Sequence, residues 1–136
     1  RGDRAAFEHM LDMGADVNAP DFTGKTALHW AAASANGELL VYNLLMEGAE
    51  TEVRDKQGYT PLHVHCAKGR YYAVSCLLYH GADVNAVSDY NSLTPLQIAA
   101  QFQHKDIVRI LLAHGAKASD TTSELKKAIN KLLSND

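Results

Sequence analysis

A four-residue motif recurs along this chain at a fixed spacing. T-A-L-H stands at residues 26–29, T-P-L-H at 60–63 and T-P-L-Q at 94–97, so each copy begins 34 residues after the previous one. A period of this length is typical of chains built from stacked structural units, each of which contacts only its neighbours. The sequence therefore predicts a linear array of small units.

A second motif, led by glycine, follows the same period. It reads G-A-D-V-N at residues 14–18, G-A-E at 48–50, G-A-D-V-N at 81–85 and G-A at 115–116, with glycines 34, 33 and 34 residues apart. Because two independent motifs stay in step, chance does not explain the repeat. The repeat extends over nearly the whole chain.

Each unit is predicted to contain two helices. Threonine at the start of the first motif is a good N-cap, and the proline after it fits the first helical turn, where its missing N–H costs nothing. A break follows at Gly69 in one unit and at residues 36–37 in another. The second helix has apolar residues at helical spacing, as in 107–112, and ends at a glycine. Asp-led stretches ending in glycine, at 21–24 and 55–58, are typical of tight turns.

This combination strongly resembles the ankyrin repeat. The resemblance rests on the T-P-L-H, the paired alanines, the leucine run and the G-A-D-V-N, and it implies an all-α repeat solenoid. Stacked helix-turn-helix ankyrin repeats would carry β-hairpin fingers. The sequence departs from the family pattern at Ala27 in place of proline, at Gln97 in place of histidine, and at Ser92 where the finger glycine is expected.

The repeat phase divides the chain into one ankyrin repeat array over residues 1–136. We expect a partial repeat at 1–22, since residues 2–14 align with a second helix only. Repeats follow at 23–56, 57–90 and 91–120, and a C-terminal capping helix at 121–136. A capping box between Thr121 and Glu124 begins that helix, and its apolar residues share one face. We interpret the chain as the C-terminal part of a longer array.

Composition excludes several classes of function. The net charge of −3 gives no basic field for nucleic acid or anionic lipid. No apolar stretch reaches membrane-spanning length, and two cysteines do not make a disulfide scaffold. We expect an intracellular monomer (cytoplasmic, nuclear or both) that has no cofactor and binds neither nucleic acid nor membrane.

The stretch H-V-H-C at residues 63–66 is the strongest rival signal, because it raises the idea of a metal-dependent enzyme. His63 and His65 are two apart and point in opposite directions on a helix, whereas His63 and Cys66 share a face but supply only two ligands. Cys66 beside His65 would be a poor nucleophilic pair for the same geometric reason. In the repeat phase, His65 and Cys66 occupy the alanine pair, so we interpret them as packing residues.

Two short motifs carry further hypotheses. R-G-D at residues 1–3 spells an adhesion tripeptide, but the repeat phase places it at a turn and a helix start. The stretch from Leu77 to Ala86 resembles the site that asparaginyl hydroxylases modify in ankyrin proteins, which makes Asn85 a candidate for hydroxylation. Asn18 fits this pattern less well, and the alternative is that asparagine here bonds the turn backbone.

The family resemblance implies a non-enzymatic protein–protein interaction module that binds a protein partner through its concave face. The large side chains expected there are typical interface anchors, and the nearby lysines favour a partner with acidic groups. The predicted partner-binding residues are Phe22, Lys25, Lys56, Tyr59, Lys68, Tyr90, Leu93, Gln101 and Phe102.

The sequence is compatible with several kinds of parent protein. A larger regulatory or scaffold protein, a free-standing regulator resembling inhibitors of cyclin-dependent kinases, and the ankyrin domain of a transcription regulator all have this kind of array. An array attached to an enzyme or channel is a further alternative.

Overall fold

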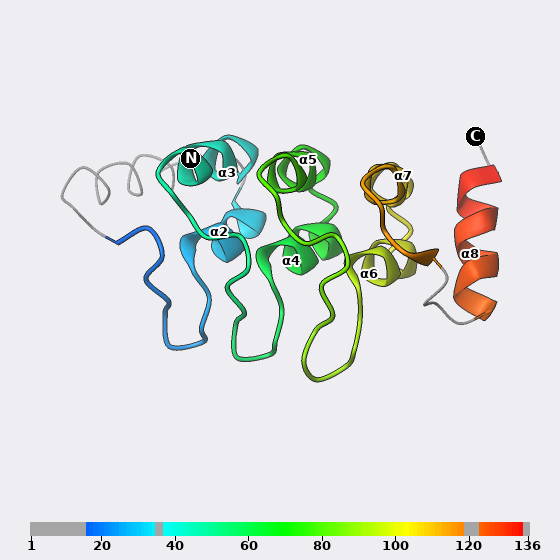
Figure 1. Cartoon of the computed structure of the whole chain (residues 1–136), viewed down its shortest axis with the longest axis horizontal. Coiled ribbons are helices and arrows are strands. Elements are labelled where there is room, and N and C mark those ends of the chain that lie inside the picture. The colour runs from blue at the N-terminus through cyan, green and yellow to red at the C-terminus, as the bar shows by residue number, and fades with distance from the viewer. Residues whose placement is uncertain (1–15, 35–36, 119–122, 135–136) are drawn as a thin grey trace.

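The computed structural model describes residues 16–34, 37–118 and 123–134. Within them the chain forms pairs of short helices that stand side by side in a row (Figure 1). The elements in chain order are α2 (Ala27–Trp30), the 3₁₀ turn η1 (Ala31–Ala33), α3 (Gly37–Met46), α4 (Pro61–Lys68), α5 (Tyr71–Tyr79), α6 (Pro95–Gln101), α7 (Lys105–Ala113) and α8 (Ser123–Ser134).

The helices make two layers. The first helices of the repeats (α2, α4 and α6) form one layer, and the second helices (α3, α5 and α7) form the other. Long loops extend from the first-helix side between successive repeats (Figure 1). The all-α repeat solenoid predicted from the sequence is therefore confirmed.

The threonine and histidine of the first motif build a capping box that also joins neighbouring repeats. His63 Nδ1 accepts a hydrogen bond from the Thr60 backbone N–H at 3.2 Å, and the Thr60 hydroxyl accepts one from the His63 N–H at 3.4 Å. His63 Nε2 then donates to the Leu93 carbonyl at 2.9 Å, in the next loop. His29 makes the corresponding bond to the Tyr59 carbonyl, also at 2.9 Å. The first histidine of the H-V-H-C stretch is thus a structural residue.

The core includes one buried leucine from the first helix of each repeat. Leu28, Leu62 and Leu96 of the first layer are each 1% exposed. Burying one such side chain contributes roughly 2 kcal/mol. The small residues Ala31 and Ala99 are fully buried, so they let neighbouring helices approach closely.

The loops are held by their first polar residue, as the Asp-led turns predict. Asp21 Oδ1 accepts hydrogen bonds from the backbone of Thr23 and Lys25, at 2.8 and 3.0 Å. Asp55 repeats this arrangement in the next loop. In the third loop Ser88 takes the place of the aspartate: its hydroxyl oxygen accepts a hydrogen bond from the Leu93 N–H, and this turn is one residue longer. Ser92 lies in the left-handed region of the backbone, at φ 55°. The loops fold back as hairpin turns, although no residue in the described ranges is assigned to a β-strand.

The last helix, α8, closes the described array. It lies across α6 and α7 (Figure 1) and buries Ile129. Three predicted features lie outside the described residues: the R-G-D tripeptide, most of the partial repeat predicted at 1–22, and Thr121 of the predicted capping box. The predicted repeat boundaries stay predictions.

Candidate functional site

A groove of about 390 Å³ runs between the second and third loops and across the first helices α4 and α6. Six of the nine residues predicted to bind a partner line it, although they come from five separate places in the sequence. These six are Lys25, Tyr59, Lys68, Leu93, Gln101 and Phe102.

The walls of the groove are largely apolar and are held in place by contacts between repeats. Tyr59 is half-buried; its ring centroid lies 5.7 Å from that of His63, and its hydroxyl accepts a hydrogen bond from Asn91 Nδ2 at 2.6 Å. Phe102 stacks on His104 with ring centroids 6.3 Å apart and remains 54% exposed. Tyr59 therefore shapes the groove, while Phe102 presents a free aromatic face at its edge.

Positive charge lies at the rim of the groove. Lys25 Nζ is 3.4 Å from Oδ2 of the buried Asp55, which compensates that carboxylate. Lys68 is exposed at the C-terminal end of α4. The groove thus combines an apolar floor with an exposed cation.

Three predicted residues lie outside this groove. Phe22 and Tyr90 are 85% and 79% exposed in the loops, and Lys56 is also exposed in its loop. The backbone N–H of Lys56 donates to the Thr23 carbonyl at 2.9 Å, so neighbouring loops are bonded together. The structure does not bring these three side chains into one pocket with the other six.

Sequence reasoning overlooked Trp30. It stands directly after the T-A-L-H motif, at the position that Val64 and Ile98 hold in the next two repeats, and those two residues line the groove. The indole Nε1 donates to Asp21 Oδ2 at 2.6 Å, and Lys25 Nζ lies 5.8 Å from the ring. Hydrogen bonds from the Thr23 hydroxyl and then from the Trp30 indole lower the pKa of Asp21 to about 2. The sequence signal that could have identified Trp30 is its place in the repeat, directly after the T-A-L-H motif.

The two residues that replace the alanine pair are in the core. His65 is fully buried, its Nε2 lies 2.9 Å from the Leu28 carbonyl oxygen, and burial lowers its pKa to about 4. Cys66 is also fully buried, and burial raises the pKa of its thiol. Both side chains are too buried to reach a metal ion or a substrate, and the protonated thiol of Cys66 is not the thiolate that metal binding and nucleophilic attack require. In the part of the chain that the structure describes, no three His, Cys, Asp or Glu side chains are grouped as metal ligands.

Asn85 joins two repeats. Its Nδ2 donates to the Gly115 carbonyl at 3.3 Å, and its Oδ1 accepts from the Lys117 N–H at 2.9 Å. Asn18 makes the same pair of bonds two repeats earlier, to Gly48 and Glu50. The nitrogen and the oxygen of the Asn85 side-chain amide are therefore both hydrogen-bonded in the folded chain.

None of the helices within the described ranges has the length and apolar character needed to cross a membrane.

The chain matches the family model described as "Ankyrin repeats (3 copies)" over residues 32–122. The chain belongs to the ankyrin-repeat family, and ankyrin arrays of this kind are protein–protein interaction modules.

Relatives with this array are otherwise diverse. The chain is 34% identical over 115 residues to the B-cell lymphoma 3 protein homolog of Mus musculus, which covers 81% of this chain and 25% of that protein. It is 36% identical over 78 residues to Delta-latroinsectotoxin-Lt1a of Latrodectus tredecimguttatus, covering 57% of this chain and 6% of the toxin. It is 40% identical over 83 residues to the E3 ubiquitin-protein ligase KEG of Arabidopsis thaliana, covering 60% of this chain and 5% of that protein. The chain thus spans a small fraction of each of these relatives.

Proposed function

We propose that this array binds an acidic segment of a protein partner in the groove between its second and third loops. The observation that carries the proposal is the combination in one groove of apolar walls with the exposed Lys68. An aromatic or large aliphatic side chain of the partner would lie against Leu93 and Phe102. A neighbouring carboxylate would pair with Lys68, which sets the orientation of the bound segment and raises the association rate.

The array acts by binding and performs no catalysis in this proposal. We infer that the side chains lining the groove position the partner, and the thiol of Cys66 is held protonated in the core. We place the array inside a larger regulatory or scaffold protein, because it covers between 5% and 25% of the three relatives compared above. An intracellular location fits its two free cysteines, Cys66 and Cys76.

Affinity capture with matched variants tests the groove. The double variant Phe102→Ala/Lys68→Glu removes an exposed ring and reverses an exposed charge, so the fold should be kept. Tyr90→Ala is the matched control, since Tyr90 is exposed outside the groove. We expect partners captured by the wild type to be lost with the double variant and kept with the control. Retention of the same partners by the double variant would place binding elsewhere.

Hydroxylation of Asn85 is a separate proposal that the sequence pattern supports. Since the side-chain amide bonds both Gly115 and Lys117, an enzyme would reach it only after this turn opens. Peptide mass spectrometry of the protein from an animal cell would show one added oxygen atom on Asn85. An unmodified Asn85 under conditions that modify other ankyrin proteins would exclude it.

A further inference from the structure

The outer surface of the second-helix layer has an apolar patch that the fold does not require. On α3 it contains Leu39, Tyr42 and Met46, at i, i+3 and i+7, and on α5 it contains Tyr72 and Tyr79, at i and i+7. Tyr79 is 88% exposed, Tyr72 67% and Met46 62%. Because α3 and α5 pack side by side, their stripes form one surface, which we call the outer patch.

The third repeat provides an internal comparison. Counting back from the glycine that follows each second helix, Met46 and Tyr79 correspond to Ala113 on α7, and Tyr72 corresponds to Asp106. The same scaffold therefore folds with a small or charged residue at these positions. Exposed apolar patches of this kind commonly mark interaction surfaces.

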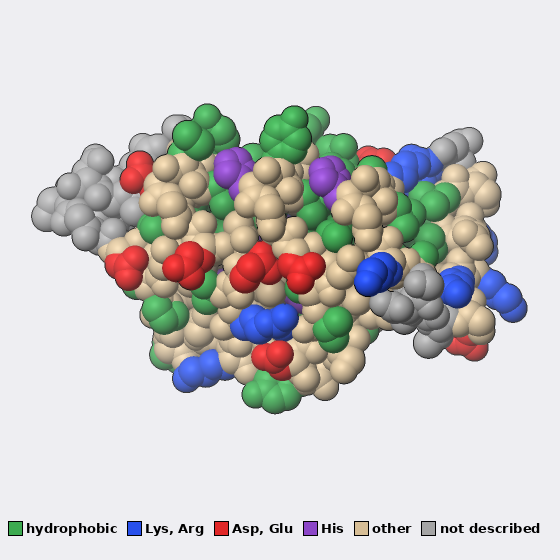
Figure 2. Space-filling model, viewed as in Figure 1, with side chains coloured by type: hydrophobic (Ala, Val, Ile, Leu, Met, Phe, Trp, Pro, Cys, Tyr) green, Lys and Arg blue, Asp and Glu red, His purple; other side chains and the backbone are tan. Residues whose placement is uncertain are grey.

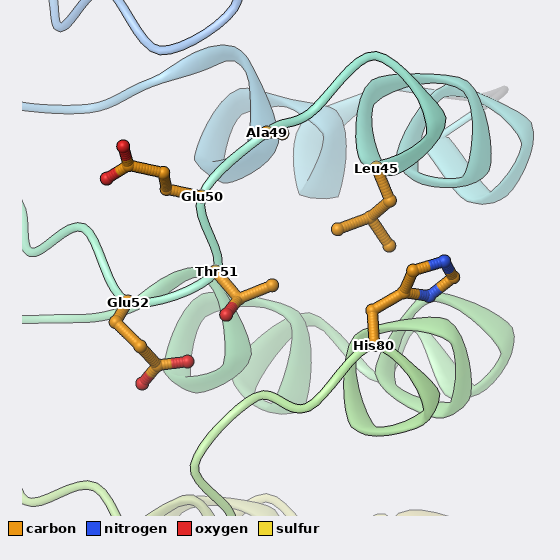
Figure 3. Close-up of a pocket in the computed structure, with 6 residues that line it drawn as sticks. All are labelled: Leu45, Ala49, Glu50, Thr51, Glu52 and His80. Carbon is orange, nitrogen blue, oxygen red and sulfur yellow. The ribbon is translucent and has the colours of Figure 1, made fainter.

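A groove of about 490 Å³ opens at one end of the outer patch, between the C-terminal ends of α3 and α5. Figure 3 shows Leu45 and His80 pointing toward each other across it, with Glu50 and Glu52 extending from the segment that follows α3. Met46 and Tyr79 of the outer patch precede or follow the groove residues Leu45 and His80 directly in the chain, so the patch and the groove share the C-terminal ends of α3 and α5.

The surroundings of the outer patch are acidic. Residues 37–53 and 71–86 contain Glu38, Glu47, Glu50, Glu52 and Asp83 but no lysine or arginine, and all five acidic residues are exposed. Figure 2 shows the hydrophobic side chains along the upper edge over α3 and α5 and a row of acidic side chains across the middle of the same face. This charge would repel an anionic lipid surface and attract a basic polypeptide.

We propose that the outer patch binds an amphipathic helical segment of a second partner, with large apolar residues on one face and lysine or arginine on the other. Its apolar side chains pack on Met46, Tyr72 and Tyr79. A lysine or arginine stem lies along Leu45 and Ala49 in the groove, with the charged end at Glu50 and Glu52, since such side chains combine an apolar stem with a charged tip. The array would then bind two partners of opposite charge, one on each layer.

The probe for this proposal is a labelled synthetic peptide of about four helical turns, with leucine on one face and lysine on the other. Its counterpart carries glutamate in place of lysine. Fluorescence anisotropy with the 136-residue chain should show binding of the lysine peptide at least about tenfold tighter than of the glutamate peptide. Equal affinity for the two peptides would overturn the proposal.

Variants taken from the third repeat separate the patch from general charge attraction. Met46→Ala/Tyr79→Ala introduces the residue found at Ala113 and leaves the net charge unchanged, while Glu50→Lys introduces the residue found at Lys117. Each should weaken binding of the lysine peptide by at least about tenfold. Phe102→Ala/Lys68→Glu, on the other layer, should have no such effect. Unchanged affinity in Met46→Ala/Tyr79→Ala would overturn the proposal, and thermal unfolding of each variant checks that the fold is kept.

Two further measurements distinguish other occupants. If sedimentation shows a dimer of the wild type that Met46→Ala/Tyr79→Ala abolishes, the patch joins two copies of this chain and the proposal is wrong. The same holds if vesicles of phosphatidylcholine and phosphatidylserine bind the wild type but not this variant, because the patch would then contact lipid.

Discussion

The imidazole of His65 is completely buried, and its Nε2 donates a hydrogen bond to the Leu28 carbonyl oxygen of the preceding repeat at 2.9 Å. Its Nδ1 has no hydrogen-bond partner. With the proton on Nε2, a second proton on Nδ1 would place a charge in the core without compensation. The ring is therefore held neutral, at a position where the neighbouring repeats have Ala31 and Ala99.

This burial predicts that the array loses stability in mild acid. The pKa of His65 is lowered from 6.5 to about 4 by burial, so only the unfolded chain takes up this proton as the pH falls between those values. The free energy of unfolding should therefore decrease over that window, by about 3 kcal/mol for this group, and level off below it. Burial also lowers the pKa of His29 and His63, which adds to the loss with the same sign.

Urea unfolding of wild type and His65→Ala across this pH window measures the effect. The variant should be less stable near neutral pH, because the ring leaves a void, but its stability should fall less steeply with acid. Parallel pH dependence in the two proteins would show that His65 does not titrate on unfolding.

Glu52 stands where Asn18 and Asn85 stand in other repeats, and it makes only part of their contact. Its Oε2 accepts from the Asp83 N–H at 3.2 Å, but a carboxylate cannot donate to the Gly81 carbonyl as the asparagine amide does to Gly115. We expect Glu52→Asn to stabilise the array by about 0.5–1 kcal/mol, since it supplies the missing donor. The reciprocal Asn85→Glu should destabilise by a similar amount. Thermal unfolding of both checks the signs, and a destabilised Glu52→Asn would contradict the account.

The double role of His63 predicts an ordered series of variants. Gln97 shows that glutamine serves in the capping box, where its Oε1 accepts from the Thr94 N–H at 2.9 Å. His63→Gln should therefore keep the bond from Thr60 and lose the one to Leu93, at a cost of about 1 kcal/mol. His63→Ala loses both and leaves a void, so it should cost about 2–4 kcal/mol. Equal losses in denaturant unfolding would show that the capping bond contributes nothing.

The repeat phase predicted the helix pairs, the caps and the Asp-held turns, because each depends on residues close together in sequence. It did not predict which loop aromatics are buried. Tyr59 is half-buried because of Asn91, 32 residues later, whereas Tyr90 is exposed. It also did not predict which apolar residues of the second helices face the core. Tyr79 is exposed, because the phase of a helix decides which side chain faces its neighbour.

The close packing of successive loops can be measured at two glycines with similar backbones. Gly48 and Gly58 lie at φ 90° and 82°, a region that costs a residue with a Cβ about 1–2 kcal/mol. A Cβ at Gly48 would meet no atom within 4 Å, whereas at Gly58 it would lie 2.6 Å from the Asp89 backbone nitrogen. Gly48→Ala should therefore show the backbone cost alone, about 1–2 kcal/mol. Gly58→Ala should cost more, because the third loop must shift away from the second. Denaturant unfolding of the pair measures the difference, and equal losses would mean that the loops move apart without cost.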